Sequence, residues 1–238
     1  MNMKKYFAAF VAAASLFAVN PAVYAAPEET APAAEQAAAE NGARQVSPEE
    51  ALKLYKESGY EHVSDRYGYK IILPEKPKSV LPLSVVVDGA KGEIFIFDND
   101  GYTLKHTWSV MLNAFDEASI PVDLNKKTEA EQEKYLETIH NSMPCDLVRV
   151  TDVNGVAGVY VITAKEYELD VKGNGKFETV KEDSQAVRTF FRGKLGGRFL
   201  VEVQQNPEIT FEGEAMYQLG LLTFEEVPAI KMQPAAKK

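Results

Sequence analysis

The sequence predicts an α+β fold built around an antiparallel sheet, and three observations lead to this fold class. Two apolar runs in residues 186–205 flank residues 193–197, a connection with three glycines that can adopt the positive φ values of a tight reversal. In the second run, Val201 and Val203 alternate with Glu202, which is the period of a strand with one buried face. Further apolar segments before and after this hairpin supply candidate strands and a candidate cover. We therefore expect a sheet-centred domain.

Residues 1–25 have the three parts of a secretory signal peptide. Lys4 and Lys5 precede an apolar run over residues 7–19, and small side chains follow at Val23 and Ala25, where a signal peptidase reads the chain. A membrane anchor is the alternative, but a span needs about 20 apolar residues and this run is shorter. The sequence therefore predicts an extracytoplasmic protein, periplasmic or secreted, with no membrane span after cleavage.

The rest of the chain divides into three parts by composition. Residues 26–46 are rich in Ala, Glu and Pro, with almost no bulky apolar side chain, which predicts a disordered linker. Residues 47–227 carry the periodic patterns and predict one α+β domain. Residues 228–238 predict a disordered tail.

Composition and charge exclude some classes of partner. Hydrophobic residues make up 45% of the chain and charged residues 26%, which is typical of a globular protein. The formal net charge is -9, whereas nucleic acids and anionic membranes require a basic face. We therefore expect no nucleic-acid partner. The chain is expected to be a monomer that binds an envelope protein or a small ligand.

The first half of the domain predicts one helix and several strands. Ser47 with Glu50 forms a capping box before a short amphipathic helix that ends at Gly59. Strands are expected over residues 68–74, 81–87 and 93–98. Residues 102–115 fit either a strand or a helical stripe. The Asp-Gly turn before them and their threonines favour the strand.

The second half continues the alternation of helix and strand. A Glu-rich pattern predicts a helix over residues 126–141, and its carboxylates are interpreted as a solvated face. Residues 147–152 are expected to pair, through the turn Asn154-Gly155, with a long strand over residues 156–169. That strand is apolar on both faces and is therefore expected to be central. A reversal at residues 173–175, a strand at 177–180 and a final helix after Pro207 complete the domain.

Three of these features together resemble the PsbP-like and DcrB-like proteins. They are the strand from Gly68 to Pro74, the Asn154-Gly155 turn within antiparallel strands, and the closing helix that leads into Phe224. The resemblance implies an α/β/α sandwich in an exported or lumenal protein that acts by binding or as an accessory subunit. Such proteins often carry a tryptophan shortly after the strand's proline, and this chain has none there. No family binding residue can be carried over.

The chain contains no motif typical of a catalytic or cofactor site. A Gly-x-Ser-x-Gly elbow, a phosphate-binding glycine loop and a His-Glu-x-x-His pair are all missing from the sequence. The three histidines lack the close spacing of a metal site. We therefore expect no cofactor, no metal and no catalytic residue.

Five side chains are candidates for ligand binding. Trp108 could line a groove together with His106 and Tyr102, or it could belong to the core. Arg188 and Arg192 share one face of the hairpin, where they suit an anionic ligand or, equally, a surface ion pair with Glu202. These residues represent the main hypothesis, a non-catalytic binding or accessory protein of the bacterial cell envelope.

The alternative hypothesis is an envelope hydrolase. Its site would be assembled in space from carboxylates, which are plentiful, or from Cys145, the only cysteine. A single cysteine forms no internal disulfide, and we interpret Cys145 as a small buried side chain, with a catalytic thiol as the alternative.

Overall fold

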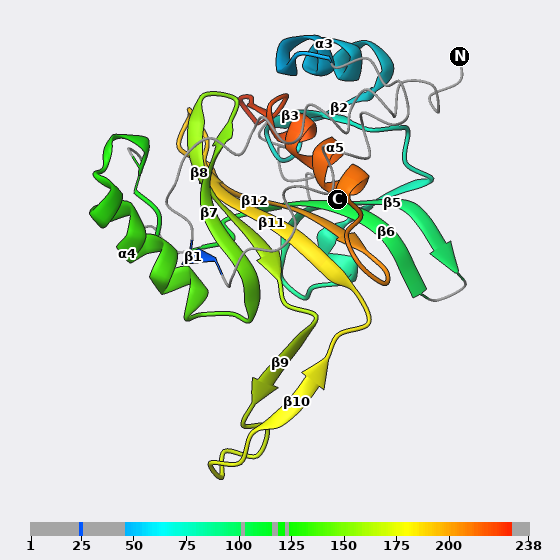
Figure 1. Ribbon diagram of the computed structural model, residues 1–238. Coiled ribbons are helices and arrows are strands. Elements are labelled where there is room, and N and C mark those ends of the chain that lie inside the picture. Colours follow the sequence, from blue (N-terminus) through cyan, green and yellow to red (C-terminus); the bar gives the residue numbers. More distant parts are fainter. Residues whose placement is uncertain (1–23, 26–45, 101–102, 116–118, 122–123, 230–238) are drawn as a thin grey trace, which may run out of the picture.

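An eight-stranded antiparallel sheet forms the centre of the structure, as the sequence predicts (Figure 1). The computed structural model describes residues 24–25, 46–100, 103–115, 119–121 and 124–229. The strand order is β1-β7-β8-β11-β12-β6-β5-β4, and every neighbouring pair is antiparallel. Its strands are β1 (Tyr24–Ala25), β4 (Ser79–Pro82), β5 (Lys91–Asp100), β6 (Thr103–Leu112), β7 (Cys145–Val153), β8 (Val156–Thr163), β11 (Gln185–Arg192) and β12 (Arg198–Gln205).

Smaller elements surround this sheet. A second sheet has the order β13-β3-β2, and a third consists of the hairpin β9-β10. Their strands are β2 (Tyr60–Ser64), β3 (Tyr69–Leu73), β9 (Glu166–Leu169), β10 (Glu178–Lys181) and β13 (Glu225–Glu226). The helices are α3 (Pro48–Ser58), α4 (Glu129–His140) and α5 (Phe211–Leu221), with short 3-10 turns η3 (Leu83–Val85) and η4 (Leu124–Lys126).

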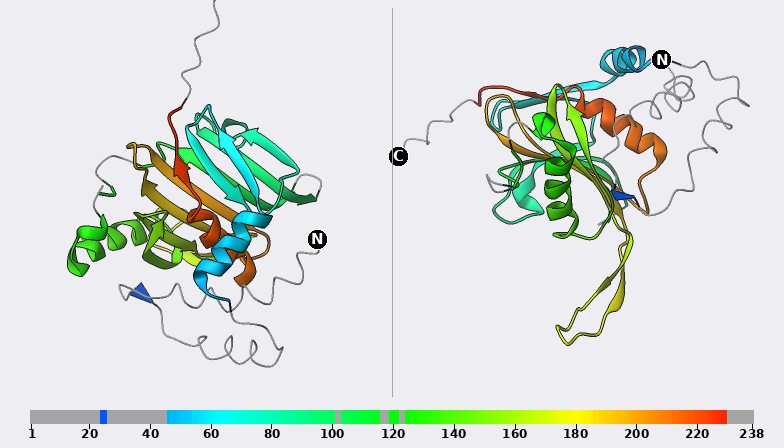
Figure 2. Two further views of the ribbon diagram at one scale, coloured as in Figure 1. Left: turned by 90° about the horizontal axis from the view of Figure 1, so that it is seen from above. Right: turned by 60° about the vertical axis from the view of Figure 1, so that its left-hand side comes forward.

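One face of the eight-stranded sheet, here called the α5 face, carries the main core. Aromatic and aliphatic side chains from β5, β6, β11 and β12 pack there against α5, β3 and Phe224. The hydroxyl of Tyr217, on α5, donates to the backbone oxygen of Val201 at 2.7 Å. α3 lies over α5, where Tyr55 is buried and donates its hydroxyl to the backbone oxygen of Ile72. This side of the sheet is therefore closed by helices and a small sheet together (Figure 2).

The opposite face, here called the α4 face, is covered over only part of its width. Leu136 and Ile139 of α4 pack against Val159 and Val161 of β8 in a second cluster that also includes Phe190 of β11. Strands β12, β6, β5 and β4 extend beyond α4, and the segment that contains η3 lies beneath them (Figure 1). The α4 face is therefore covered by α4 on the side of β7 and β8 only.

The hairpin β9-β10 stands away from the body of the molecule on the side of the α4 face (Figures 1 and 2). Its strands pair only with each other, and Leu169 and Phe177 are exposed. Cross-strand contacts between Lys181 and Glu166, at 2.8 Å, and between Thr179 and Glu168 hold its two strands in register.

Local sequence signals account for the helix boundaries. Ser47 accepts a hydrogen bond from the backbone N–H of Glu50 at the start of α3, with Pro48 at the first helical position. Thr128 and Glu131 form a reciprocal capping box at the start of α4. The expected helices at 47–59, at 126–141 and after Pro207 are therefore confirmed.

Most expected strands are confirmed, including residues 103–112 as strand rather than helix. Two are wrong in part. Residues 81–87 form a strand only as far as Pro82 and then turn into η3, because proline ends the ladder with β5. The long strand over 156–169 is two strands, β8 and β9, since the chain leaves the sheet at Ala164 and begins the separate hairpin. β2 is a strand that the sequence analysis did not predict.

The remaining boundaries are described only in part. Residues 46–229 contain the elements expected for the domain, and their mixture of sheet and helix agrees with the α+β class. The expected linker, the tail from residue 230, Tyr102 and most of the predicted signal peptide lie outside the described residues. Among the helices that the structure describes, none is long and apolar enough to cross a membrane.

Candidate functional site

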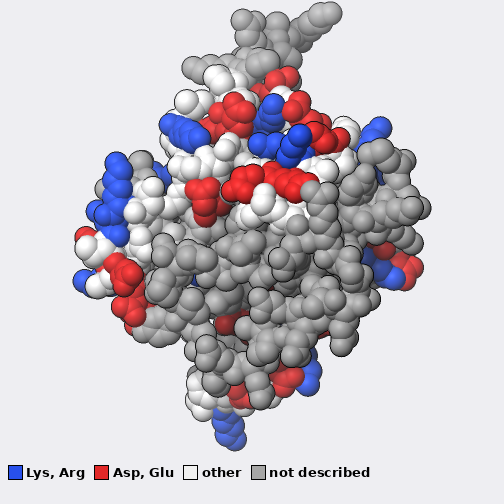
Figure 3. All heavy atoms as spheres, turned by 45° about the horizontal axis from the view of Figure 1, so that its top comes forward, with Lys and Arg blue, Asp and Glu red and all other residues white. Residues whose placement is uncertain are grey.

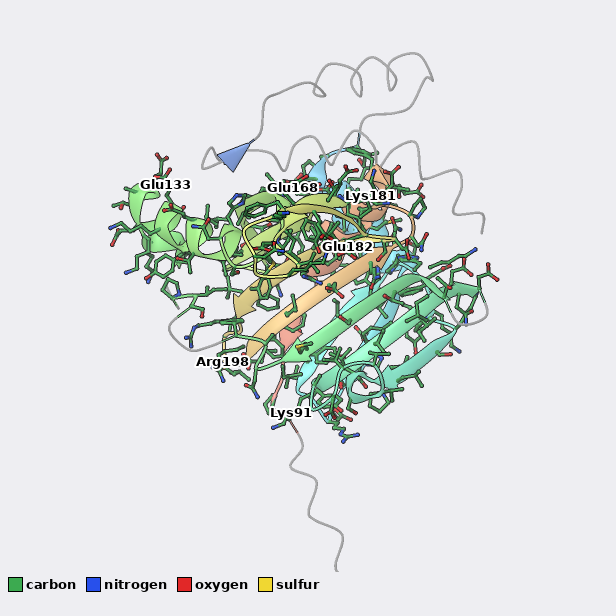
Figure 4. The ribbon with its side chains drawn as sticks, turned by 90° about the horizontal axis from the view of Figure 1, so that it is seen from below. Lys91, Glu133, Glu168, Lys181, Glu182 and Arg198 are labelled. Carbon is green, nitrogen blue, oxygen red and sulfur yellow. The ribbon has the colours of Figure 1, made fainter. Side chains whose placement is uncertain are left out.

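A pocket opens on the uncovered part of the α4 face, between the η3 segment and strands β5, β6, β11 and β12. Its volume is about 300 Å³. It is lined by Leu83, Val86, Val87, Ile94, Leu104, Thr107, Ser109, Met111, Arg188, Phe190, Leu200, Glu202 and Gln204. Figure 4 looks toward this face from below and shows the β9-β10 hairpin, with Glu168 and Lys181, on the near side of the sheet. We call the pocket between η3 and these strands the open-face pocket.

The floor of the open-face pocket combines polar side chains of its strands, such as Thr107, Ser109 and Gln204, with apolar ones, such as Phe190 and Leu200. Arg188 on β11 lies directly opposite Glu202 on β12, and its Nε donates to Oε2 of that carboxylate at 2.5 Å. Both side chains are partly exposed, at 34% and 20%. The two charges neutralise each other, so the floor has hydrogen-bonding groups but little net charge.

The rim of the pocket is apolar and exposed. Val85, Val86 and Val87 have exposed fractions of 65%, 51% and 45%. Leu81 on β4, which is also exposed, pairs with Ile94 of the pocket lining and so lies on the same face. Several exposed apolar side chains this close together are typical of a contact site. The pocket and this rim together can bind a partly apolar ligand or partner segment.

Trp108 and His106 do not line the pocket, and the third candidate, Tyr102, lies outside the described residues. Trp108 is 1% exposed and lies on the α5 face, 5.4 Å between ring centroids from Tyr217. Its indole covers Gly220 so closely that a Cβ there would lie 2.7 Å from the ring. His106 lies on the same face against Phe97, and burial lowers its pKa while the charge of Asp98 offsets part of that effect. Trp108 is a core residue, which was the other interpretation of its pattern.

The two arginines have different surroundings. Arg188 lines the open-face pocket and forms the ion pair with Glu202 that the sequence analysis considered. Arg192, four residues further along β11 on the same face, donates its Nε to the backbone oxygen of Ile120 at 2.7 Å. Of the four candidates within the described residues, Arg188 is the one that lines the pocket.

The sequence analysis missed the rim. Residues 81–87 were predicted to form a strand, so the turn into η3 and the exposed valines beside it were not expected. Pro82, followed by three consecutive valines without a polar alternation, was the signal that could have separated them from a half-buried strand.

Cys145 has a histidine neighbour that its sequence context did not show. The last residue of α4, His140, places its Nδ1 3.3 Å from the Sγ of Cys145 at the start of β7. Burial raises the pKa of the Cys145 thiol, and the charge of Asp146 raises it further. The pair has the spacing of a thiol and a base, but these surroundings favour the neutral thiol.

Glu93 is the centre of a partly buried polar cluster. Its Oε2 accepts hydrogen bonds from Nε2 of His62, at 3.0 Å, and from the hydroxyl of Tyr69. Burial alone would raise the pKa of Glu93, but the bonds from His62 and Tyr69 outweigh it and the pKa is lowered. The nearby Ser64 is 4% exposed, so its hydroxyl cannot meet a substrate. The cluster connects β2 and β3 to β5 and is structural.

Other kinds of site receive no support from the described residues. No three His, Cys, Asp or Glu side chains in the described ranges lie close enough together to hold a metal ion. On the face shown in Figure 3, the described basic and acidic side chains are interspersed rather than gathered into a basic patch. Comparison with protein-family models and with curated proteins finds no match to this chain.

Proposed function

We propose that the chain is an exported, non-catalytic binding or accessory protein of the bacterial cell envelope, which contacts its ligand or partner through the open-face pocket. The observation that carries the proposal is the combination of an exposed apolar rim, Val85 to Val87, with a floor of mixed polarity whose two charges, Arg188 and Glu202, are already paired. Such a surface binds by burying apolar area and by hydrogen bonds rather than by reacting.

The leader and the family resemblance support the cellular part of the proposal. A signal peptide over residues 1–25 delivers the chain across the membrane, and the PsbP-like resemblance implies binding or accessory roles. The antiparallel sheet with helices on both faces agrees with the coarse fold that this resemblance implies.

The test uses the mature chain, from Ala26, recovered from its own cell envelope. Native mass spectrometry measures bound small molecules, and cross-linking in intact cells captures protein partners. The variant Val86→Glu places a charge on the rim, whereas the control Val63→Glu changes an apolar side chain of similar exposure, 49%, on the separate sheet. We expect Val86→Glu to reduce the bound fraction about tenfold and Val63→Glu to leave it unchanged. Equal binding by both variants would show that the pocket is not the site.

The contact between Cys145 and His140 favours a second candidate function, an envelope hydrolase with a thiol nucleophile. Purified mature chain would then hydrolyse an ester or peptide substrate, and Cys145→Ser would abolish the activity without lowering the melting temperature. Because the thiol pKa is raised, alkylation of Cys145 is expected to accelerate only above the usual pH range of a free thiol. An unchanged phenotype and activity in Cys145→Ser would exclude this candidate.

A further inference from the structure

The outer edge of β7 is nearly unoccupied. In the described part of the chain its only outer neighbour is β1, two residues long, which pairs antiparallel with Tyr24 opposite Val148 and Ala25 opposite Leu147 (Figure 1). β7 itself has nine residues. Most of the edge therefore has no strand partner among the described residues.

The direction of the β7 amides follows from the turn that joins it to β8. Asn154 and Gly155 have φ values of 50° and 83°, as in a two-residue type I′ turn, so Val153 and Val156 exchange hydrogen bonds. Alternation along the strand then directs the amide groups of Val148, Val150 and Asp152 outward. β1 reaches the first of these positions and not the other two.

β7 is less protected against another strand than β4, at the opposite edge of the eight-stranded sheet. Natural edge strands are usually short or bulged, or carry proline or charged side chains, lysine above all. β7 has nine residues, no lysine or proline, and one register shift, which lies at its start between Cys145 and Leu147. Its charged residues are Asp146, Arg149 and Asp152. β4 has four residues, ends in Pro82 and follows Lys78. Of these two edges, the β7 edge is the longer and the less protected.

We propose that the β7 edge is a docking site for an extended segment of a partner protein, which adds to the sheet as an antiparallel strand. The proposal rests on the proposed function, because removal of residues 1–25 takes β1 away and leaves the edge free. β1 pairs antiparallel with this edge, with Tyr24 opposite Val148, and we expect the partner segment to have the same direction and register. Main-chain hydrogen bonds to Val148, Val150 and Asp152 would provide the affinity.

The structure also indicates which side chains such a segment needs. Val148 is buried, and Val150 packs against the same cluster beneath Leu136 and Ile139 of α4. A partner residue opposite Val148 projects to this same face, because directly paired residues share a face of the sheet. The partner segment should therefore carry apolar side chains at alternate positions.

Amide hydrogen exchange on the chain from Ala26 tests the proposal, with a synthetic peptide of residues 20–28 as the probe. We expect saturating peptide to slow exchange about tenfold or more at Val150 and Asp152, whose amides face outward. The inward amides of Arg149 and Thr151 already bond β8 and should not change. Unchanged exchange at Val150 and Asp152 under saturating peptide would overturn the proposal.

A matched pair of variants separates main-chain pairing from packing. Val150→Ala and Val150→Pro both shorten a side chain in the cluster, but only the proline removes the outward N–H. We expect Val150→Pro to bind the peptide about tenfold more weakly than Val150→Ala, and equal binding would contradict the inference. Should Val150→Pro fail to fold, the exchange result decides alone. Peptide binding that survives Val86→Glu distinguishes this edge from the open-face pocket, so either proposal can fail separately.

Discussion

At the scale of single residues, the charges inside this molecule have partners from distant parts of the chain. Glu93 on β5 accepts hydrogen bonds from His62 on β2 and from Tyr69 on β3. Burial, and then the charge of Glu93, raise the pKa of Tyr69 well above its usual range. Arg188 and Glu202, by contrast, are directly opposite on neighbouring strands of one sheet. A polar side chain in this protein is therefore best interpreted from the strand or sheet that lies against it.

We predict that Glu93→Gln lowers the free energy of unfolding by about 2 kcal/mol at neutral pH, because hydrogen bonds to a charged acceptor are lost. The pKa of Glu93 is lowered in the folded state, so its stabilisation is present above about pH 4.3 and is lost as pH falls through the folded pKa. Urea unfolding across pH measures this. The difference in free energy of unfolding between wild type and variant should become smaller at low pH.

The control for this prediction is Glu61→Gln, which removes an exposed partner of Lys70. It should change stability by no more than about 0.5 kcal/mol, since exposed ion pairs contribute little. If Glu93→Gln lowers the free energy of unfolding by as much at low pH as at neutral pH, the charge of Glu93 does not contribute to stability.

At the scale of the elements, local sequence signals explain some helix and strand boundaries, and tertiary contacts explain the others. Helix caps at Ser47 and Thr128 involve residues three positions apart, so the sequence predicts them. The end of β4 at Pro82 and the departure of β9 from the sheet depend on which strands lie beside them. The sequence analysis missed β2 because its less exposed residues, Tyr60, His62 and Ser64, do not form an apolar stripe. Its place is set by pairing with β3 and by the packing of His62 on Phe95, with ring centroids 4.8 Å apart.

Pairing of β5 with β6 gives the prediction at this scale. Gly92 has a φ of 143°, and a Cβ there would lie 1.9 Å from the backbone oxygen of Val110. Gly92→Ala should therefore lower the free energy of unfolding by more than about 2 kcal/mol. Gly89→Ala is the matched control, since Gly89 also has positive φ but no atom lies within 4 Å of its Cβ position. It should cost about 1 kcal/mol. Thermal unfolding measures both, and equal losses would contradict this account of the β5-β6 contact.

At the scale of the whole molecule, α3 is connected to the sheet through α5. The buried side chains of α3 form a separate cluster with α5, outside the main cluster. Ala51 and Tyr55 are each 1% exposed and pack against Leu219 of α5. α5 in turn covers the sheet through Tyr217. The layers are therefore connected, and the domain should unfold as one unit.

We predict that a chain from Val46 melts at the same temperature as one from Ala26, because the intervening residues are expected to be linker. A chain from Tyr60, which lacks α3, should melt about 8 °C lower or more, since it loses buried side chains from the α5 contact. Differential scanning calorimetry shows both midpoints and the number of transitions. Two separate transitions for the chain from Ala26 would contradict a single domain.

The sequence by itself determined the α+β class, the three helices and most strands, because caps, turns and alternation involve residues close together in the chain. It also marked Glu202 as pointing away from the core. Tertiary structure alone decided that Trp108 is buried, that Arg188 pairs within the pocket and that Cys145 meets His140. Burial and contact depend on which face α5, α4 and η3 cover, and those elements lie far from the strands they cover in sequence. A pattern along one strand shows that a face is apolar or polar, whereas only the neighbouring layer decides whether that face is closed.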